Sequence, residues 1–297
     1  MPAPPTPKFH EPVLVEAVLD LLRPGAGTLV DCTLGAGGHA RALAGRAAGA
    51  RLLGIDADPA AVAEAGRRLS DLIDKREVFV RHDDYVRLVA IVDELELKPV
   101  MGVLLDLGAS WHQLRTPGRG FGFAAEGPLD MRFDPGKGPT AGELIARAPV
   151  GEIERWLREY GEEPFARRIA RRIDENRPAL GTTADLAMLV RRSVPRARQR
   201  RTLARVFQAL RIRVNDELAK VRAGIEAAIE VLAPGGRLVV ISYHSLEDRI
   251  VKTRFRAGAQ AGELVVLTRR PVRPGAAEAA RNPAARSAKL RAAEKAG

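Results

Sequence analysis

Several residue types are scarce in this 297-residue chain, and each scarcity excludes a class of protein. Cys32 is the only cysteine, so no intrachain disulfide can form, which favours a reducing compartment such as the cytoplasm. Aromatic residues make up 4% of the chain, and no apolar run is long enough to span a membrane. The N-terminal sequence MPAPPTPKF has no apolar core and therefore does not read as a signal peptide.

Acidic residues are also in deficit. Lysine and arginine number 48 against 37 aspartates and glutamates, which gives a formal net charge of +11. A balance of this kind indicates a polyanionic partner, and nucleic acid is the first candidate. No Cys/His spacing resembles a zinc site and no Ser/His/Asp arrangement has a nucleophile elbow, so we expect neither a bound metal nor a serine hydrolase.

The most informative pattern is a glycine-rich loop between two short apolar runs. The segment Leu29–His39 reads LVDCTLGAGGH, in which an apolar run ends at Asp31 and the loop leads into a helix-like segment. The next apolar run ends at Asp56. Glycines let the backbone approach a ligand, the helix presents free N–H groups, and an acid about 20 residues on can accept both ribose hydroxyls. This unit predicts a nucleotide-like ligand.

A third acid, Asp106, also follows an apolar run, and the three acids together bear on which ligand binds. S-adenosylmethionine carries a sulfonium cation and no phosphate, so carboxylates lining its pocket attract it. Asp31, Asp56 and Asp106 therefore favour S-adenosylmethionine over NAD, whose pyrophosphate they would repel. The remaining alternative is an ordinary strand–turn–helix unit with solvated acids.

Apolar periodicity predicts an α/β chain with a Rossmann-like, doubly wound parallel sheet. A helix is expected around 13–22, and strands near Thr28–Cys32, Arg51–Asp56, Glu77–Arg81, Val100–Asp106 and Gly236–Ser242. Helices are expected between them at His39–Arg46, Pro59–Ile73 and Tyr85–Glu94. The stretch from Ala141 to about Ala204 reads as helical throughout. We therefore predict a discontinuous sheet domain, residues 1–110 and 214–297, interrupted by a helical substrate-recognition domain, residues 111–213.

Two strand ends carry candidate catalytic residues. Asp106 in LLDLGAS lies at the C-terminal edge of the fourth strand, where a carboxylate can orient an exocyclic amine for attack on a methyl group. The alternative is that Asp106 only caps the loop or contacts the cofactor. His244, in the polar cluster Ile241–Arg249, could orient a flipped base, while Ser245 is expected to be the N-cap of the next helix with Asp248 three residues on.

Nine arginines and no acid lie between Arg191 and Arg213, and arginine pairs bidentately with phosphate. The residues expected to contact RNA are Arg196, Arg198, Arg200, Arg201 and Arg205. Tyr85 is a candidate to stack on an adenine ring, whereas His82 reads as a structural loop histidine. Phe121, Phe123 and Trp111 can stack on bases, although packing is the simpler reading of each. In the basic tail, Asn282–Arg291 is a further contact candidate.

The whole chain resembles the bacterial ribosomal RNA small-subunit methyltransferase H family, also called MraW. Matching stretches run in order along nearly the full length: His10–Leu14, Asp31–His39, Leu104–Gly108, Gly127–Arg132, Tyr160–Glu163, Phe207–Ile212, Ser242–Lys252 and Asn282–Arg291. The resemblance implies a class I S-adenosylmethionine-dependent methyltransferase sheet with an inserted helical domain. It also implies methylation of N4 of a cytosine in the decoding region of 16S rRNA, within the small ribosomal subunit.

The same resemblance implies cofactor contacts at Gly37, Gly38, His39, Asp56, Tyr85, Asp106 and Gln113. The chain departs from the family pattern in Ala109–Arg115, where Trp111 replaces a small serine and Arg115 an acid. Two rival functions stay open at this point: a DNA amino-methyltransferase, and a non-catalytic RNA-binding assembly factor. The first would have an Asp/Asn-Pro-Pro-aromatic motif, which the sequence lacks, and the second would not need the acids and glycines. A homodimer is left open.

Overall fold

Two units divide the chain in the computed structural model, which describes residues 12–47, 49–75 and 77–297. The first unit comprises residues up to Gly108 and from Leu218 onward, and the second is Ala109–Glu217. The domain boundaries predicted from the sequence were at residues 110 and 213. The proline-rich lead and part of the His10–Leu14 stretch lie outside the described residues.

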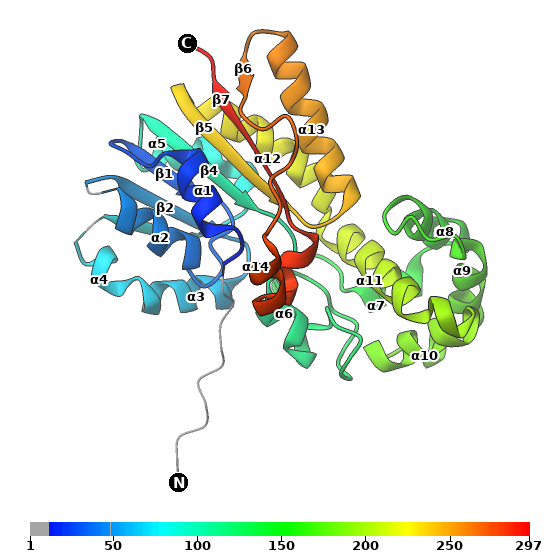
Figure 1. Cartoon of the computed structure of the whole chain (residues 1–297). Coiled ribbons are helices and arrows are strands. Elements are labelled where there is room, and N and C mark those ends of the chain that lie inside the picture. The colour runs from blue at the N-terminus through cyan, green and yellow to red at the C-terminus, as the bar shows by residue number, and fades with distance from the viewer. Residues whose placement is uncertain (1–11, 48, 76) are drawn as a thin grey trace. The chain divides into compact units, whose positions relative to one another are not determined.

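A seven-stranded sheet forms the centre of the first unit (Figure 1). Its strands are β1 (Thr28–Asp31), β2 (Arg51–Asp56), β3 (Val78–His82), β4 (Val100–Asp106), β5 (Leu232–Ser242), β6 (Leu264–Val266) and β7 (Lys289–Lys295). The strand order is β3-β2-β1-β4-β5-β7-β6. Strands β1 to β5 pair in parallel, and β7 is antiparallel to both β5 and β6.

The register of the central strands brings three acids to one edge of the sheet. Asp31 is paired with Gly54 of β2 and with Leu104 of β4, so β1, β2 and β4 end at nearly the same level. Asp31, Asp56 and Asp106 are the last residues of these strands. The strand order reverses between β1 and β4, and ligands in open α/β sheets bind at the carboxyl ends of the strands beside such a reversal.

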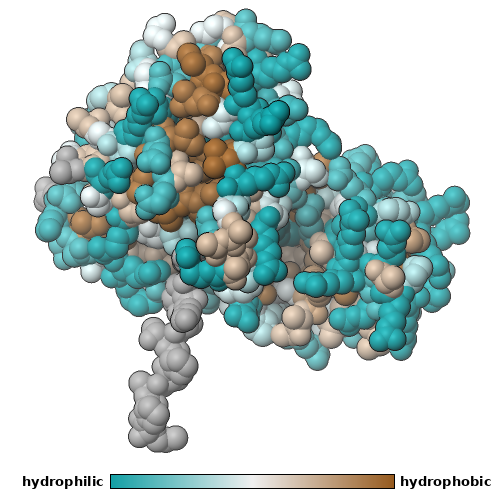
Figure 2. Space-filling view, viewed as in Figure 1, coloured by the Kyte–Doolittle hydropathy of each residue, from teal (hydrophilic) through white to brown (hydrophobic). Residues whose placement is uncertain are grey.

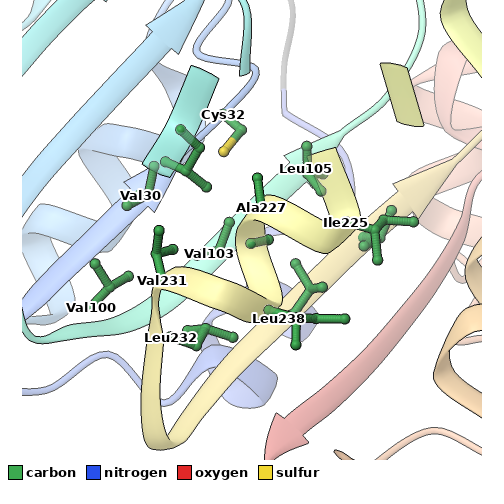
Figure 3. Packing of buried hydrophobic residues seen from close by; sticks show 14 of the residues in the cluster. Val30, Cys32, Val100, Val103, Leu105, Ile225, Ala227, Val231, Leu232 and Leu238 are labelled. Atoms are coloured by element: carbon green, nitrogen blue, oxygen red, sulfur yellow. The ribbon is translucent and has the colours of Figure 1, made fainter. Parts of the chain in front are cut away.

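Helices cover both faces of this sheet and close two apolar clusters. One face packs against α5 (Leu88–Glu94), α12 (Glu217–Val231) and α13 (Ser245–Gln260). The other packs against α1 (Val15–Leu22), α2 (Gly38–Arg46), α3 (Pro59–Arg68) and the segment η5 (Pro283–Ser287). Cys32 lies within the first cluster near Val30 (Figure 3) and is free and buried.

The second unit is helical and has its own buried core. Its α-helices are α6 (Trp111–Arg115), α7 (Ala141–Arg147), α8 (Val150–Glu159), α9 (Ala166–Glu175), α10 (Thr183–Ser193) and α11 (Gln199–Asn215). Short 3-10 turns are η2 (Pro117–Arg119), η3 (Arg177–Ala179) and η4 (Arg196–Arg198). Reciprocal capping boxes, Thr140 with Glu143 and Thr182 with Asp185, begin α7 and α10, and each satisfies the backbone N–H groups of its two residues.

Some predicted elements differ from the structure. The helix expected over Pro59–Ile73 is broken at the buried Leu69, where α3 ends and α4 (Ser70–Ile73) begins. The last parallel strand, β5, begins at Leu232 rather than Gly236, because the Ala-Pro-Gly-Gly segment bulges between its pairings with Val100 and Gly102.

The basic tail differs too. The helix predicted over Tyr85–Glu94 begins as a short 3-10 turn, η1 (Tyr85–Arg87), and continues as α5 from Leu88. The tail segment is folded into the sheet unit, and its contact with RNA stays a prediction. It contributes α14 (Ala276–Arg281), the turn η5 and strand β7. Ala285, Ala288 and Leu290 are buried in the sheet unit. Among the described residues, no helix is both long and apolar enough to cross a membrane.

Candidate active site

The glycine loop owes its residues to backbone geometry and close packing. Gly37 precedes α2 with a left-handed φ of 79°, and a Cβ there would lie 2.9 Å from Leu69. At Gly38 a Cβ would lie 3.0 Å from Pro12. Gly35 also has a positive φ of 52°, and its N–H donates to Oδ2 of Asp56 across 2.7 Å. The loop is thereby tied to the end of β2.

Asp56 is held by backbone donors on both of its oxygens. Gly35 donates to Oδ2, and the N–H of Asp58 donates to Oδ1 across 2.8 Å. Burial nevertheless raises the pKa of Asp56 to about 6, because desolvation outweighs these two hydrogen bonds. Each carboxylate oxygen can accept more than one hydrogen bond, so this side chain retains capacity for a ribose diol.

Asp31 and His39 form a second, more deeply buried part of the edge. Asp31 is 1% exposed; its Oδ1 accepts the N–H of Thr33, and its Oδ2 has no hydrogen-bond partner among the described residues. Burial raises the pKa of Asp31 to about 6. The imidazole of His39 is buried as well, and its Nδ1 has no hydrogen-bond partner in the described part of the chain. An unpaired buried carboxylate oxygen is costly, which indicates a ligand that completes it.

Asp106 links the ends of β4, β1 and β5. Its N–H donates to the hydroxyl of Thr33 across 2.6 Å, and its Oδ1 accepts the hydroxyl of Tyr243 across 2.8 Å. Its Oδ2 lies 3.5 Å from Nε2 of His39. Burial lowers the pKa of His39, but the carboxylates of Asp106 and Asp31 outweigh it, so the pKa is raised overall. The side chain of Asp106 thus has a fixed orientation and is 14% exposed.

Sequence reasoning missed Tyr243 and Thr33 as members of this site. Burial raises the pKa of the Tyr243 hydroxyl well above its ordinary value, and the neighbouring Asp106 carboxylate acts in the same direction, so Tyr243 is a hydrogen-bond donor. Tyr243 lies two residues after Ile241, which is paired with Asp106 in the sheet, and this pairing is what places the two side chains together. That register was not readable from spacing, because some 130 residues separate the two strands.

His82 is the last residue of β3 and Tyr85 lies three residues beyond it, and the structure gives each a local contact. The Tyr85 ring packs on α12 at Gly224, where a Cβ would come within 2.5 Å of the ring. The stacking of this ring on adenine stays a prediction. Nε2 of His82 lies 3.1 Å from the carbonyl oxygen of Ala57, which is consistent with a structural loop role.

The predicted cap of α13 is wrong by one residue. The N-cap is His244, not Ser245, and the partner is Glu247 rather than Asp248. The Glu247 carboxylate accepts the N–H groups of Tyr243 and His244, whereas Asp248 binds Arg291 of β7 across 2.7 Å. His244 therefore has a structural position at the helix start, and its part in catalysis stays a prediction.

Gln113 belongs to the second unit, in helix α6. Its Oε1 accepts the N–H of Ser110, and the Ser110 hydroxyl accepts the N–H of Gln113, which together form a capping box. A contact between Gln113 and the cofactor stays a prediction. Trp111 and Arg115, the two departures from the family pattern, contact each other: the guanidinium lies 5.1 Å from the centre of the indole ring.

The arginine-rich segment divides into paired and exposed residues. Arg196, Arg198, Arg200 and Arg201 are exposed on η4 and the start of α11. Arg205 is instead partly buried, with Nη1 3.7 Å from the buried carboxylate of Glu163. Arg211 binds Glu217 with two nitrogens, and Arg213 lies over the Trp156 ring. The protein itself therefore supplies partners for Arg205, Arg211 and Arg213. RNA contact by Arg205 and by the four exposed arginines stays a prediction.

Three acids at one sheet edge require a positive partner. Among the described residues, no lysine or arginine forms an ion pair with Asp31, Asp56 or Asp106. A cation is attracted by this edge, and the free Oδ2 of Asp31 fits a ligand with an ammonium or sulfonium group. The donors and acceptors present therefore fit S-adenosylmethionine, with Asp56 as the residue for its ribose.

The strand order, the antiparallel β7 and the acid-lined glycine loop define a class I S-adenosylmethionine-dependent methyltransferase sheet, as predicted. The model of the MraW methylase family matches residues 7–296. The chain belongs to the MraW methylase family.

Relatives with curated names agree with this membership. The chain is 46% identical over 306 residues to the ribosomal RNA small subunit methyltransferase H of Thermomicrobium roseum, covering 96% of this chain and 93% of that protein. It is 43% identical to the protein of that name from Heliobacterium modesticaldum, covering 96% and 98%. A solved rRNA methylase from Streptococcus thermophilus is similar with a TM-score of 0.44 at 13% identity, covering 95% and 94%.

Proposed function

We propose that this protein transfers a methyl group from S-adenosylmethionine to the N4 amine of a cytidine in the decoding region of 16S rRNA, within the small ribosomal subunit. The observation that carries the proposal is the edge formed by Asp31, Asp56 and Asp106, where three carboxylates face one histidine, His39, and no lysine or arginine of the described residues forms an ion pair with them. Membership of the MraW methylase family and the names of the relatives support the choice of ribosomal RNA. The cytidine N4 target follows from the resemblance of the motifs.

The cofactor would lie along the carboxyl ends of β1, β2 and β4. Asp56 would accept the ribose hydroxyls, while the backbone from Gly35 to His39 would line the amino-acid end. Asp31 and Asp106 would lie beside the positive groups, since both carboxylates project from the same edge. When bound, S-adenosylmethionine supplies a methyl group activated by its sulfonium, so that no metal is needed for the leaving group.

Asp106 is the residue best placed to act on the amine. The lone pair of an exocyclic amine is delocalised into the base, which makes the amine a poor nucleophile. A carboxylate that accepts one N–H bond favours a pyramidal nitrogen and aligns the lone pair with the methyl group. The Tyr243 hydroxyl occupies Oδ1 of Asp106, which orients Oδ2 for this role. After transfer, the surplus proton of the amine passes to solvent water.

The RNA must present its target base outside the helical stack, because the amine of a stacked base cannot reach the methyl group of the cofactor. Exposed arginines of the second unit, Arg196, Arg198, Arg200 and Arg201, would bind the phosphate backbone. Small ribosomal subunits reside in the bacterial cytoplasm, which would be the place of action.

The test is a comparison of methyl acceptors with labelled S-adenosylmethionine. Small subunits lacking decoding-site modifications, free 16S rRNA and duplex DNA are incubated with the protein, and incorporated label is measured. We expect label on the subunits and little on the other two. Label on DNA would instead favour an amino-methyltransferase of DNA. No label on any acceptor, despite calorimetric binding of S-adenosylmethionine, would favour a non-catalytic assembly factor.

A further inference from the structure

Helix α9 of the second unit carries four arginines on one exposed face. Its sequence ARRIARRIDE places Ala166, Ile169, Ala170 and Ile173 in the buried core of the unit. These positions follow the i, i+3, i+4, i+7 spacing of an amphipathic helix. The alternate pairs Arg167–Arg168 and Arg171–Arg172 are consequently all directed away from the core and are exposed.

This face is a cluster of four like charges, with Glu175 as the one acid that also lines it among the described residues. Arg167 and Arg171, and likewise Arg168 and Arg172, are four residues apart, which destabilises an isolated helix by about 0.2–0.5 kcal/mol for each pair. Among the described residues, no side chain forms a hydrogen bond or ion pair with any of these four guanidiniums. The helix maintains the cluster only because its apolar face is buried.

The neighbouring helix α8 shows that this arrangement is not a general property of the unit. Its Arg155 lies 3.2 Å from Glu152, and its Arg158 pairs with Glu154. Exposed arginines on α8 are therefore neutralised along their own helix, whereas those on α9 are not. Figure 2 shows hydrophilic side chains over the part of the unit formed by these two helices.

The four arginines also line a hollow that is large enough for part of a ligand. It has a volume of about 550 Å³ and opens to solvent. Pro164 and the partly buried Phe165 provide its apolar wall, and Glu175 lies at the end where the helix finishes. An apolar wall beside guanidiniums suits a sugar–phosphate unit, because the sugar packs on the wall while the phosphate oxygens face the arginines.

We propose that this α9 face, Arg167, Arg168, Arg171 and Arg172 around the hollow, is a second RNA-binding surface that holds the phosphodiester backbone of the substrate. Arginine forms bidentate contacts to phosphate, and the two arginine pairs lie about 6 Å apart along the helix, so the face can bind adjacent phosphates. The inference rests on the proposed function, because it assumes an RNA substrate. The surface is distinct from Arg196, Arg198, Arg200 and Arg201.

A four-residue glutamine variant tests this surface. R167Q/R168Q/R171Q/R172Q removes four charges while retaining good helix formers. The matched control is K252Q/R256Q/R269Q/R270Q, which removes four exposed charges of the sheet unit. Binding to protein-free 16S rRNA and to whole small subunits is measured between about 50 and 200 mM salt. Calorimetric affinity for S-adenosylmethionine checks that each variant is folded.

The expected result is a salt slope that falls by about 0.7 per lost phosphate contact in the α9 variant, hence by about 3 in total, on both RNA forms. The control should retain the wild-type slope. A lysine variant, R167K/R168K/R171K/R172K, should also retain the slope but bind more weakly, because lysine keeps the charge and loses the fork.

Two outcomes would overturn the proposal. Equal slopes for the α9 and control variants would mean that only net charge matters. A loss confined to whole subunits, with unchanged binding to protein-free rRNA, would mean that α9 contacts a protein. Failure of the proposed function is separate, because it would appear as wild-type protein that methylates none of the RNA acceptors.

Discussion

The sheet edge and helix α9 both concentrate one sign of charge, but they do so in opposite surroundings. At the edge, Asp31 and Asp56 are desolvated, and burial raises the pKa of both to about 6. On α9 the arginines are in water, where repulsion is weak and screened by salt. A buried cluster thus selects one small cation of fitting shape, whereas an exposed cluster selects a long polyanion through many weak contacts.

The largest effect expected at the edge is on the chemical step. Asp106→Asn retains the shape but weakens the acceptor for the amine N–H, so kcat for methyl transfer to small subunits should fall by about 10²-fold. Asp20→Asn on the exposed side of α1 is the matched control. Single-turnover assays with saturating S-adenosylmethionine measure the effect. An unchanged kcat would remove Asp106 from the reaction.

The contrast between buried and exposed charge predicts that binding of the cofactor depends on pH, whereas binding of RNA by the exposed arginines does not. A cation binds the ionised carboxylates, so affinity should be lost as pH falls through about 6, where Asp31 and Asp56 take up protons. With both ionised forms required, affinity should fall about 100-fold between pH 7 and pH 5. Calorimetric titration at several pH values measures this loss. A flat profile would contradict the account of the edge.

The same raised pKa values have an opposite consequence for the ligand-free fold. The pKa of each acid is about 6 in the folded protein and 3.8 in the unfolded chain. Their contribution to the free energy of unfolding is therefore fully present below pH 3.8 and is lost as pH rises through about 6. Stabilisation by added S-adenosylmethionine should therefore grow over the same pH range.

Removal of the ribose acceptor should have an effect similar to, or smaller than, the loss of both charges. Asp56→Ala should weaken binding of S-adenosylmethionine by about 1–3 kcal/mol, through loss of charge-assisted hydrogen bonds. Asp83→Ala, on the loop after β3, is the comparison variant. Isothermal titration at pH 7 decides the point, and equal affinity in the Asp56 variant would exclude the ribose role.

The smallest expected effect concerns orientation rather than charge. Tyr243→Phe removes the hydroxyl that donates to Oδ1 of Asp106, so kcat should fall by about fivefold to tenfold, while affinity for RNA stays unchanged. Tyr160→Phe in the helical unit is the control. A decrease in RNA affinity without a decrease in kcat would mean that Tyr243 acts on the fold and not on Asp106.

Features set by neighbouring residues were predictable from the sequence, and features set by distant ones were not. An apolar run that ends in an acid predicted Asp31, Asp56 and Asp106 at the strand ends, because strand and turn chemistry is local. Tyr243 was missed, because its bond to Asp106 depends on the pairing of β4 with β5. The sequence predicts the start of β5 at Gly236 instead of Leu232, because proline and glycine normally end a strand pattern, whereas here they form a bulge within the strand.

Caps and charges show the same division. Ser245–Asp248 and His244–Glu247 both have the spacing of a capping box, and only the tertiary position of Asp248 beside Arg291 decides between them. The sequence did not single out the α9 arginines, because Asp174 and Glu175 follow them closely, whereas no acid lies between Arg191 and Arg213. Whether an arginine is neutralised depends on partners such as Glu163, which only the fold brings near Arg205.

The measurement that tests the central claim most directly is the chemical identity of the methylated nucleoside. Small subunits lacking decoding-site modifications are treated with the protein and methyl-labelled S-adenosylmethionine, and the RNA is digested and analysed by mass spectrometry. The account predicts N4-methylcytidine from one site in the decoding region, and its absence with Asp106→Asn at matched time. A label on another base, on ribose or on a carbon atom of cytosine would contradict it.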